Sequence, residues 1–232
     1  MNDDFKKLTF ISICYNDSGI TATVQSIQPF LKLGSQHIIQ NGGLPLDRNE
    51  FPLSMIYNEV DKGIYNAINK AVSKVDTEYF MLLHAGDTIV GKISDFKTIL
   101  LNLESHNSDL SLNNQLIGSR PHFSNLWRPW MLQLGAQPPH LPTIYRFSIF
   151  KDILYSEDIP IIADFDFYKS LKWNNYLSDN KLLVKMANGG KTSSGMKSFF
   201  YVNRCFLSTY GWKGWIYVLF RVPLKIVQLI KI

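Results

Sequence analysis

The segment LTFISICYNDSG (residues 8–19) sets the architecture, because a β-branched and aromatic run stops there at a cluster of turn and helix-cap residues. The same pattern, an apolar strand followed by a polar turn containing glycine, returns at residues 37–43 (HIIQNGG) and 79–87 (YFMLLHAGD). In open α/β sheets, ligands bind beyond the carboxyl ends of the strands. These three turns are therefore where we expect a functional site.

Helices are expected between these strands, at residues 20–33 and 62–75, and a further strand at residues 54–58. The second helix is indicated by an apolar stripe with helical spacing, made of Ile64, Ile68, Ala71 and Val75. Residues 105–145 contain five prolines and are predicted to be rich in loops. Strands that alternate with helices predict an α/β fold with a mostly parallel central sheet flanked by helices.

Composition excludes several classes of protein. The 232 residues are 46% hydrophobic and 19% charged, which excludes collagen, low-complexity disorder and a polytopic membrane protein. Two distant cysteines, Cys14 and Cys205, argue against a disulfide scaffold or a cysteine-based zinc site. We expect one main domain at residues 1–204 and a C-terminal segment at residues 205–232.

The charge is unevenly distributed along the chain. The net charge is +5, yet residues 180–232 hold nine of the 24 Lys and Arg residues and none of the 19 Asp and Glu residues. An acid-free basic tail predicts contact with an anionic partner. The polar residues 1–7 do not resemble a signal peptide, so we expect a cytoplasmic protein.

The tail at residues 211–232 is the most apolar stretch of the chain, but proline and charged residues interrupt it. The interrupting residues are Lys213, Arg221, Pro223, Lys225 and Lys231. With Trp212, Trp215 and Tyr217 at headgroup level, this pattern predicts an amphipathic helix lying on an anionic membrane surface, on the inner face of the cell membrane. The alternative is a helix packed on the core with snorkelling lysines. Nucleic-acid binding is not expected, because the aromatic residues lie among aliphatic ones rather than along a basic groove.

Common catalytic motifs are missing from the sequence. It contains no dinucleotide fingerprint, no phosphate loop, no H-E-x-x-H and no G-x-S-x-G, and its five histidines lack metal-ligand spacing. These absences favour a site built on carboxylates.

Three aspartates are candidates for that site. Asp87 follows a strand and a flexible Ala-Gly, so it can approach a divalent cation that carries a diphosphate. The alternative is a tight turn in which Asp87 caps the next helix. Asp164 and Asp166 interrupt the apolar octet IIADFDFY and would splay apart on a helix, which leaves one of them free to act as a general base. Helix capping is their alternative role.

Several segments between about residues 8 and 200 match one family's motifs. They are FISICYN (10–16), HIIQNGG (37–43), NEVDKGIYNAINK (58–70), YFMLLHAGD (79–87), Pro139-His140 with IYRFSIF (144–150), IADFD (162–166) and Gly189-Gly190 with Ser193-Ser194. Together they resemble the family 2 glycosyltransferases of bacterial polysaccharide assembly, which have the GT-A fold, and they look closest to the colanic-acid-type sugar transferases. Residues 61–70 are the most specific part.

This resemblance implies an inverting transfer of a sugar from a UDP-, GDP- or dTDP-sugar to a hydroxyl of a saccharide linked to a polyprenyl diphosphate. By position, Tyr15 and Asn16 would border the base and ribose, and Asp61 and Lys62 would lie along the nucleotide. Asp87 would hold Mg²⁺ or Mn²⁺.

The same resemblance implies that Asp164 is the base, with Asp166 in support. His140 would lie near the donor sugar or the acceptor, with an ordinary loop histidine as the alternative.

Three positions depart from the family pattern. Asn41 replaces the usual Asp, so it can hydrogen-bond a ribose or base but binds cations poorly. His84 stands at the first position of the metal-binding segment, and Ala163 replaces Glu in the base motif. Asn41 and His84 motivate an alternative, a catalytically inactive relative that binds nucleotide-sugar or partners at the membrane surface.

Overall fold

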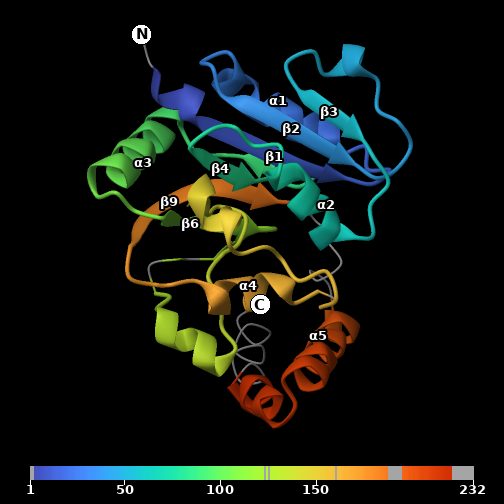
Figure 1. The fold of residues 1–232 in the computed structure, drawn as a ribbon, viewed down its shortest axis with the longest axis vertical. Coiled ribbons are helices and arrows are strands. Elements are labelled where there is room, and N and C mark those ends of the chain that lie inside the picture. Colours follow the sequence, from blue (N-terminus) through green and yellow to red (C-terminus); the bar gives the residue numbers. More distant parts are fainter. Residues whose placement is uncertain (1–2, 123, 125, 160, 188–194, 221–232) are drawn as a thin grey trace.

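The computed structural model describes residues 3–122, 124, 126–159, 161–187 and 195–220, which form a single mixed sheet with helices packed on it (Figure 1). The strand order is β3-β2-β1-β4-β8-β6-β9-β5, and β7 pairs with β6. The strands are β1 (Leu8–Cys14), β2 (Gln36–Asn41), β3 (Met55–Asn58), β4 (Tyr79–Leu82), β5 (Thr88–Ile89), β6 (Leu110–Ile117), β7 (Arg120–His122), β8 (Ile144–Arg146) and β9 (Tyr176–Met186).

The helices confirm the expected α/β class. They are α1 (Ile20–Leu31), α2 (Ile64–Val72), α3 (Ile93–Ser105), α4 (Ala163–Ser170) and α5 (Gly195–Tyr210). Four short 3-10 helices join them, η1 (Asp3–Lys7), η2 (Arg48–Glu50), η3 (Pro129–Leu134) and η4 (Phe147–Lys151). Each parallel ladder joins at least four residue pairs and each antiparallel ladder three or fewer, so the sheet is mostly parallel, as predicted.

The first four strands position the candidate site. β3, β2, β1 and β4 run parallel, so their carboxyl ends meet at one edge of the sheet. Every residue of β4 is buried, as are all but Ile13 of β1, because helices or other strands cover them on both faces. The polar turns at residues 15–19, 41–43 and 84–87 follow these strands directly.

The expectation of a loop-rich stretch at residues 105–145 is wrong for β6, a long strand inside the sheet. The expectation rested on five prolines, none of which lies in β6, where Asn113 and Asn114 are buried rather than solvated. Asn113 donates to the Pro142 carbonyl at 3.2 Å, and Asn114 donates to the Asn180 carbonyl at 2.9 Å. Partners so distant in the sequence offset the cost of burying amides.

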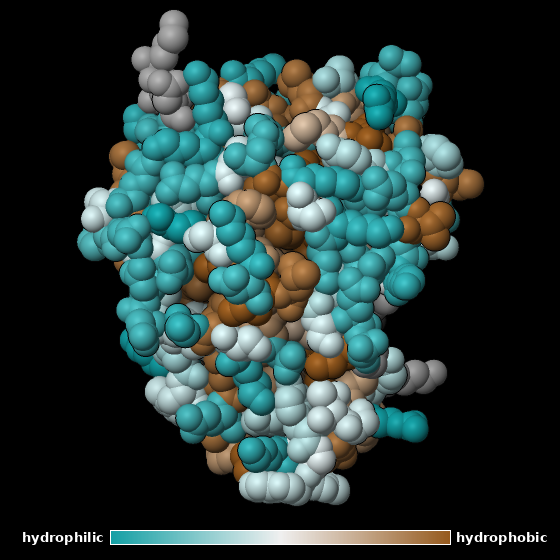
Figure 2. Space-filling model, viewed as in Figure 1, coloured by the Kyte–Doolittle hydropathy of each residue, from teal (hydrophilic) through white to brown (hydrophobic). Residues whose placement is uncertain are grey.

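A layer formed by η3, α4 and α5 lies at the end of the molecule opposite the N-terminus (Figure 1). Phe165 of α4 packs edge to face on Phe206 of α5, with ring centroids 5.0 Å apart, and on Tyr217, at 5.3 Å. Figure 2 shows that apolar side chains also reach the surface, in the middle of one face between hydrophilic margins.

The predicted tail helix is described only in its first part. Residues 212–220 are helical, and Tyr217 is buried, whereas Trp212 and Trp215 are exposed. The rest of the predicted tail helix, with Arg221, Lys225 and Lys231, lies outside the described residues, as does the glycine and serine loop at residues 189–194. No helix of the described residues combines the length and apolarity needed to cross a bilayer.

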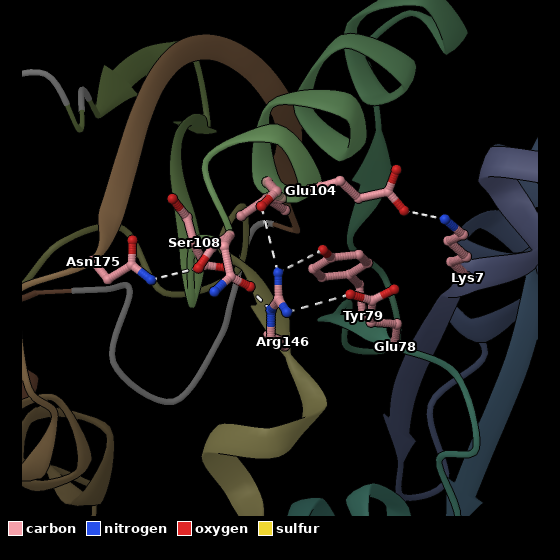
Figure 3. A network of polar contacts seen from close by, with 9 residues as sticks. Lys7, Glu78, Tyr79, Glu104, Ser108, Arg146 and Asn175 are labelled. Carbon is pink, nitrogen blue, oxygen red and sulfur yellow. Dashed lines mark hydrogen bonds and ion pairs between the residues drawn. The ribbon is translucent and has the colours of Figure 1, made fainter.

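Arg146 of β8 links segments at the end of the sheet opposite the polar turns that follow β1, β2 and β4 (Figure 3). Its guanidinium donates to the Tyr79 hydroxyl at 3.1 Å and to the Ser108 carbonyl at 3.2 Å, and pairs with Glu78 at 3.5 Å. Because Tyr79 begins β4, this network lies at the amino end of that strand. Arg146 therefore acts in stability rather than in the candidate site.

Candidate active site

The turn after β1 approaches the turn after β2 through Asn16. Asn16 adopts the left-handed conformation (φ 52°), which asparagine tolerates better than most residues, and its Oδ1 accepts the Leu44 amide at 2.7 Å. A side chain at Gly43 would collide with Asn16. Tyr15 is 69% exposed, so its ring is free to stack against a flat ligand. The structure thus brings Tyr15 and Asn16 to the turn at residues 41–44.

Asp61 meets the same turn from the other side. A side chain at Gly42 would overlap the Asp61 carboxylate, so a larger residue there would displace Asp61. Asp61 Oδ1 accepts the Gly63 amide at 2.9 Å, which shapes the entry to α2, and the neighbouring Lys62 is exposed. Asn16, Gly42 and Asp61 therefore lie close together at the carboxyl ends of the strands.

Asn41 is buried and occupied by its own turn. Its Nδ2 donates to the Leu44 carbonyl at 2.7 Å and to Asn58 Oδ1 at 2.8 Å, while its Oδ1 accepts the Gly43 amide at 3.2 Å. In this arrangement the polar atoms of Asn41 stabilise the turn at residues 41–44.

The third turn holds Asp87, which is 5% exposed. Burial raises the pKa of Asp87 to about 6, against the opposing effect of the backbone amides of Ala187 and His84. The Ala187 amide donates to Asp87 Oδ1 at 2.8 Å, which joins the end of β9 to this turn.

His84 lies in the same turn with its Nδ1 buried and without a hydrogen-bond partner among the described residues. Burial, with a smaller contribution from nearby His140, lowers the pKa of His84 to about 3, so the ring is neutral. A buried nitrogen that lacks a partner is the kind of group that a bound ligand satisfies.

The described residues contain no cluster of three His, Cys, Asp or Glu side chains that could hold a metal by themselves. One carboxylate is nevertheless a common protein contribution when Mg²⁺ is bound mainly by substrate phosphates and water. Asp87 therefore fits an ion that arrives with a diphosphate, and it does not fit a resident structural metal.

Asp164 and Asp166 point in different directions on α4, as the sequence predicted for a helix. Asp164 Oδ2 accepts Gln137 Nε2 at 2.5 Å, and its Oδ1 accepts the Tyr65 hydroxyl at 3.3 Å. Asp166 instead accepts the Tyr210 hydroxyl of α5 at 2.8 Å. Asp166 thus anchors α5, and Asp164 is the carboxylate that faces α2.

His140 is enclosed by tyrosines next to Asp164. Its Nδ1 lies 3.3 Å from the Tyr145 hydroxyl and 3.4 Å from that of Tyr168, and its Nε2 lies 3.5 Å from that of Tyr155. Burial lowers the pKa of His140, against the opposing charge of Asp164. The structure thus holds the His140 ring among three tyrosine hydroxyls, near His84 and Asp164.

Sequence reasoning did not single out Tyr65, Gln137 or the tyrosines around His140. Tyr65 lies inside the most family-specific segment, so its position was a usable signal. Gln137 carried no signal, because its contact with α4 depends on the path of a loop.

No protein-family model matches the sequence, and no curated protein does either. Solved structures do match. Staphylococcus aureus TarS 1–349 in complex with UDP-GlcNAc has a TM-score of 0.61 at 18% identity, over 92% of this chain and 71% of that one. The chain has the GT-A glycosyltransferase fold.

Other enzymes of this fold match equally well. The mannosyltransferase PcManGT from Pyrobaculum calidifontis, in complex with GDP-Man and Mn²⁺, has a TM-score of 0.59 at 9% identity, over 96% of this chain and 75% of that one. Glucosyl-3-phosphoglycerate synthase from Mycobacterium tuberculosis, with Mn²⁺, UDP and phosphoglyceric acid, has a TM-score of 0.59 at 13% identity, over 88% and 78%. This chain spans 65% of another TarS 1–349 structure and 40% of a longer TarS chain.

Proposed function

We propose that the chain is an inverting glycosyltransferase that moves a sugar from a nucleotide-diphosphate sugar to a hydroxyl of an acceptor saccharide. The observation that carries the proposal is the contact of Tyr65 with Asp164. Tyr65 belongs to the first turn of α2, directly after the Asp61 loop, so this contact brings a carboxylate to the edge where a nucleotide can lie. The structural neighbours support it, since they bind UDP-GlcNAc, UDP or GDP-Man.

In this proposal the donor lies along the three strand ends. Tyr15 and Asn16 border the base and ribose, and Asp61 with Lys62 borders the nucleotide. The Asp164 carboxylate takes the proton of the acceptor hydroxyl, whose oxygen then attacks the anomeric carbon from the face opposite the nucleoside diphosphate. The bond to the diphosphate breaks as the new bond forms, so the anomeric configuration inverts.

A divalent cation, Mg²⁺ or Mn²⁺, would be held by Asp87 and would neutralise charge on the departing diphosphate. Two of the structural neighbours are complexes with Mn²⁺, which agrees with such use. His84 lies in the same turn, and its Nδ1, which has no hydrogen-bond partner in the described part of the chain, can contact an oxygen of the donor.

The acceptor is proposed to be a saccharide on a polyprenyl diphosphate, reached at an anionic membrane on its cytoplasmic face, in surface polysaccharide synthesis. The C-terminal end supports this, because Trp212 is 71% exposed, Trp215 60% and Leu219 67%. Indole rings favour the headgroup level of a bilayer, and the nine basic residues of the last 53 positions attract anionic lipid.

Vesicle binding tests the proposed contact with an anionic membrane. The double variant Trp212→Ser/Trp215→Ser should lose most sedimentation with vesicles that contain phosphatidylglycerol. Trp130→Ser, which removes an indole that is 59% exposed on η3, should bind like the parent. Equal binding by all three proteins would contradict membrane contact through this helix.

The activity itself is tested by release of nucleoside diphosphate from a panel of UDP-, GDP- and dTDP-sugars, with a membrane lipid extract as acceptor, in the presence and absence of Mn²⁺. Release from one donor, dependent on the lipid extract and lost in Asp164→Asn, supports the transferase. A protein that binds a nucleotide but turns over no donor would instead support the inactive relative. Asn41, whose polar atoms serve its own turn, and His84 are the observations that favour that second candidate.

A further inference from the structure

The carboxylate of Asp164 is held at both oxygens by side chains from two other parts of the chain. Gln137 Nε2 donates to Oδ2 at 2.5 Å, and the Tyr65 hydroxyl donates to Oδ1 at 3.3 Å. Oδ1 also accepts the amide of Phe165 at 3.0 Å. The side chain of Asp164 therefore cannot rotate without breaking contacts to α2 and to the loop after η3.

Each of the two partners is itself fixed. The Tyr65 ring stacks on Tyr155 at 5.7 Å, and Asn69, one turn further along α2, donates to the Tyr155 carbonyl at 2.9 Å. Gln137 follows Gly135, whose left-handed conformation (φ 78°) ends η3 against Tyr217. The two donors are thus placed by packing before any ligand binds.

The backbone before Asp164 is strained. Ile161 has φ 64°, a left-handed conformation that is costly for a β-branched side chain. Strain of this kind persists where the surrounding contacts fix a functional group. Here the turn at Ile161 leads directly into α4 and sets the direction from which Asp164 enters.

We infer that Tyr65 and Gln137 are positioning residues that orient the general base Asp164. The inference rests on the proposed function and names residues that the family pattern does not assign to the base. Their hydrogen bonds fix which oxygen lone pair meets the acceptor hydroxyl, since each carboxylate oxygen keeps one side engaged.

The test compares kcat and donor KM of nucleoside diphosphate release for Tyr65→Phe and Gln137→Leu. We expect kcat to fall about tenfold or more, because hydrogen bonds to the base are strong, with the larger loss in Gln137→Leu, whose contact is shorter. Donor KM should stay within about twofold, which separates a misplaced base from a general loss of structure. Tyr176→Phe, which removes the hydroxyl of a ring packed on Trp173, serves as the matched control and should keep the kcat and donor KM of the parent.

A second variant guards against misfolding. Gln137→Glu keeps the size of the side chain but replaces the Nε2 donor by a carboxylate oxygen that can only accept, so kcat should fall at least as far as in Gln137→Leu. Parent-like kcat in Tyr65→Phe and both Gln137 variants would overturn the inference while leaving the transferase intact. Retained turnover in Asp164→Asn is the separate result that would remove the proposed base, and the inference with it.

Discussion

Asp87 is expected to make the protein less stable at neutral pH than a neutral residue would. It is 5% exposed, and burial raises the pKa of its carboxyl from 3.8 to about 6. Replacing Asp87 by Asn removes the charge and keeps an Oδ1 that can accept the Ala187 amide. The variant Asp87→Asn should therefore be more stable than the parent at pH 7.5, although it should lose metal-dependent activity.

The size and sign of this stability difference follow from the linkage between folding and proton binding. Between pH 3.8 and about 6 the folded protein holds a proton on Asp87 that the unfolded chain has released, so stability falls as pH rises through this window. Each unit of pKa shift corresponds to about 1.4 kcal/mol, which gives about 3 kcal/mol above pH 6. The advantage of Asp87→Asn should thus approach about 3 kcal/mol at pH 7.5 and shrink toward zero near pH 4.

Urea unfolding followed by tryptophan fluorescence, with EDTA present, measures this difference at pH 4.5, 6 and 7.5. Other titrating groups cancel, because parent and variant share them. Asp152→Asn, at an exposed aspartate, controls for the change in net charge. A difference that does not depend on pH, or a variant less stable than the parent at pH 7.5, would refute the reasoning.

Three further outcomes are expected. Arg146→Ala should lower the free energy of unfolding by about 2–4 kcal/mol, since it breaks a mostly buried network. It should leave kcat and donor KM unchanged at temperatures where the variant is folded, and altered kinetics would contradict the remoteness of Arg146 from the site. Gly42→Ala should weaken nucleotide binding, measured by calorimetry, by roughly tenfold, because the new methyl group displaces Asp61, and unchanged affinity would count against that edge as the donor site. His37 is buried between Ser12 and Ser54, and its pKa is lowered to about 3, so it resists protonation in the folded protein. The free energy of unfolding should therefore fall as the pH drops below 6.5, and this fall should be smaller in His37→Gln. An equally steep fall in the variant would contradict the prediction.

Local signals were sufficient for the first half of the sheet. The run at residues 8–14 and the turn that follows carry their own chemistry, and the structure places β1 there within one residue. The helix expected at residues 62–75 is shorter, because α2 ends at Val72, and Ile64 of the expected buried stripe is 46% exposed. The apolar periodicity located this helix, but it carries no information on which other segments pack against the two helix ends.

The second half depends on partners that are distant in the sequence. β6 was missed because Asn113 and Asn114 are compatible with burial only when partners from other segments accept their hydrogen bonds. The surroundings of Asp164 were missed for the same reason, since Tyr65 lies 99 residues away and Gln137 lies on an irregular loop. Sequence pattern identified the carboxylate, whereas the groups that orient it follow from the folded chain.

The central claim is that Asp164 removes the acceptor proton while the donor is held elsewhere, at the strand ends. The most direct test measures, on Asp164→Asn, both the dissociation constant of the donor's nucleoside diphosphate by calorimetry and its release from the donor sugar. The account predicts a dissociation constant within about twofold of the parent and release reduced by about a hundredfold or more. Parent-like release, or loss of binding together with turnover, would contradict it.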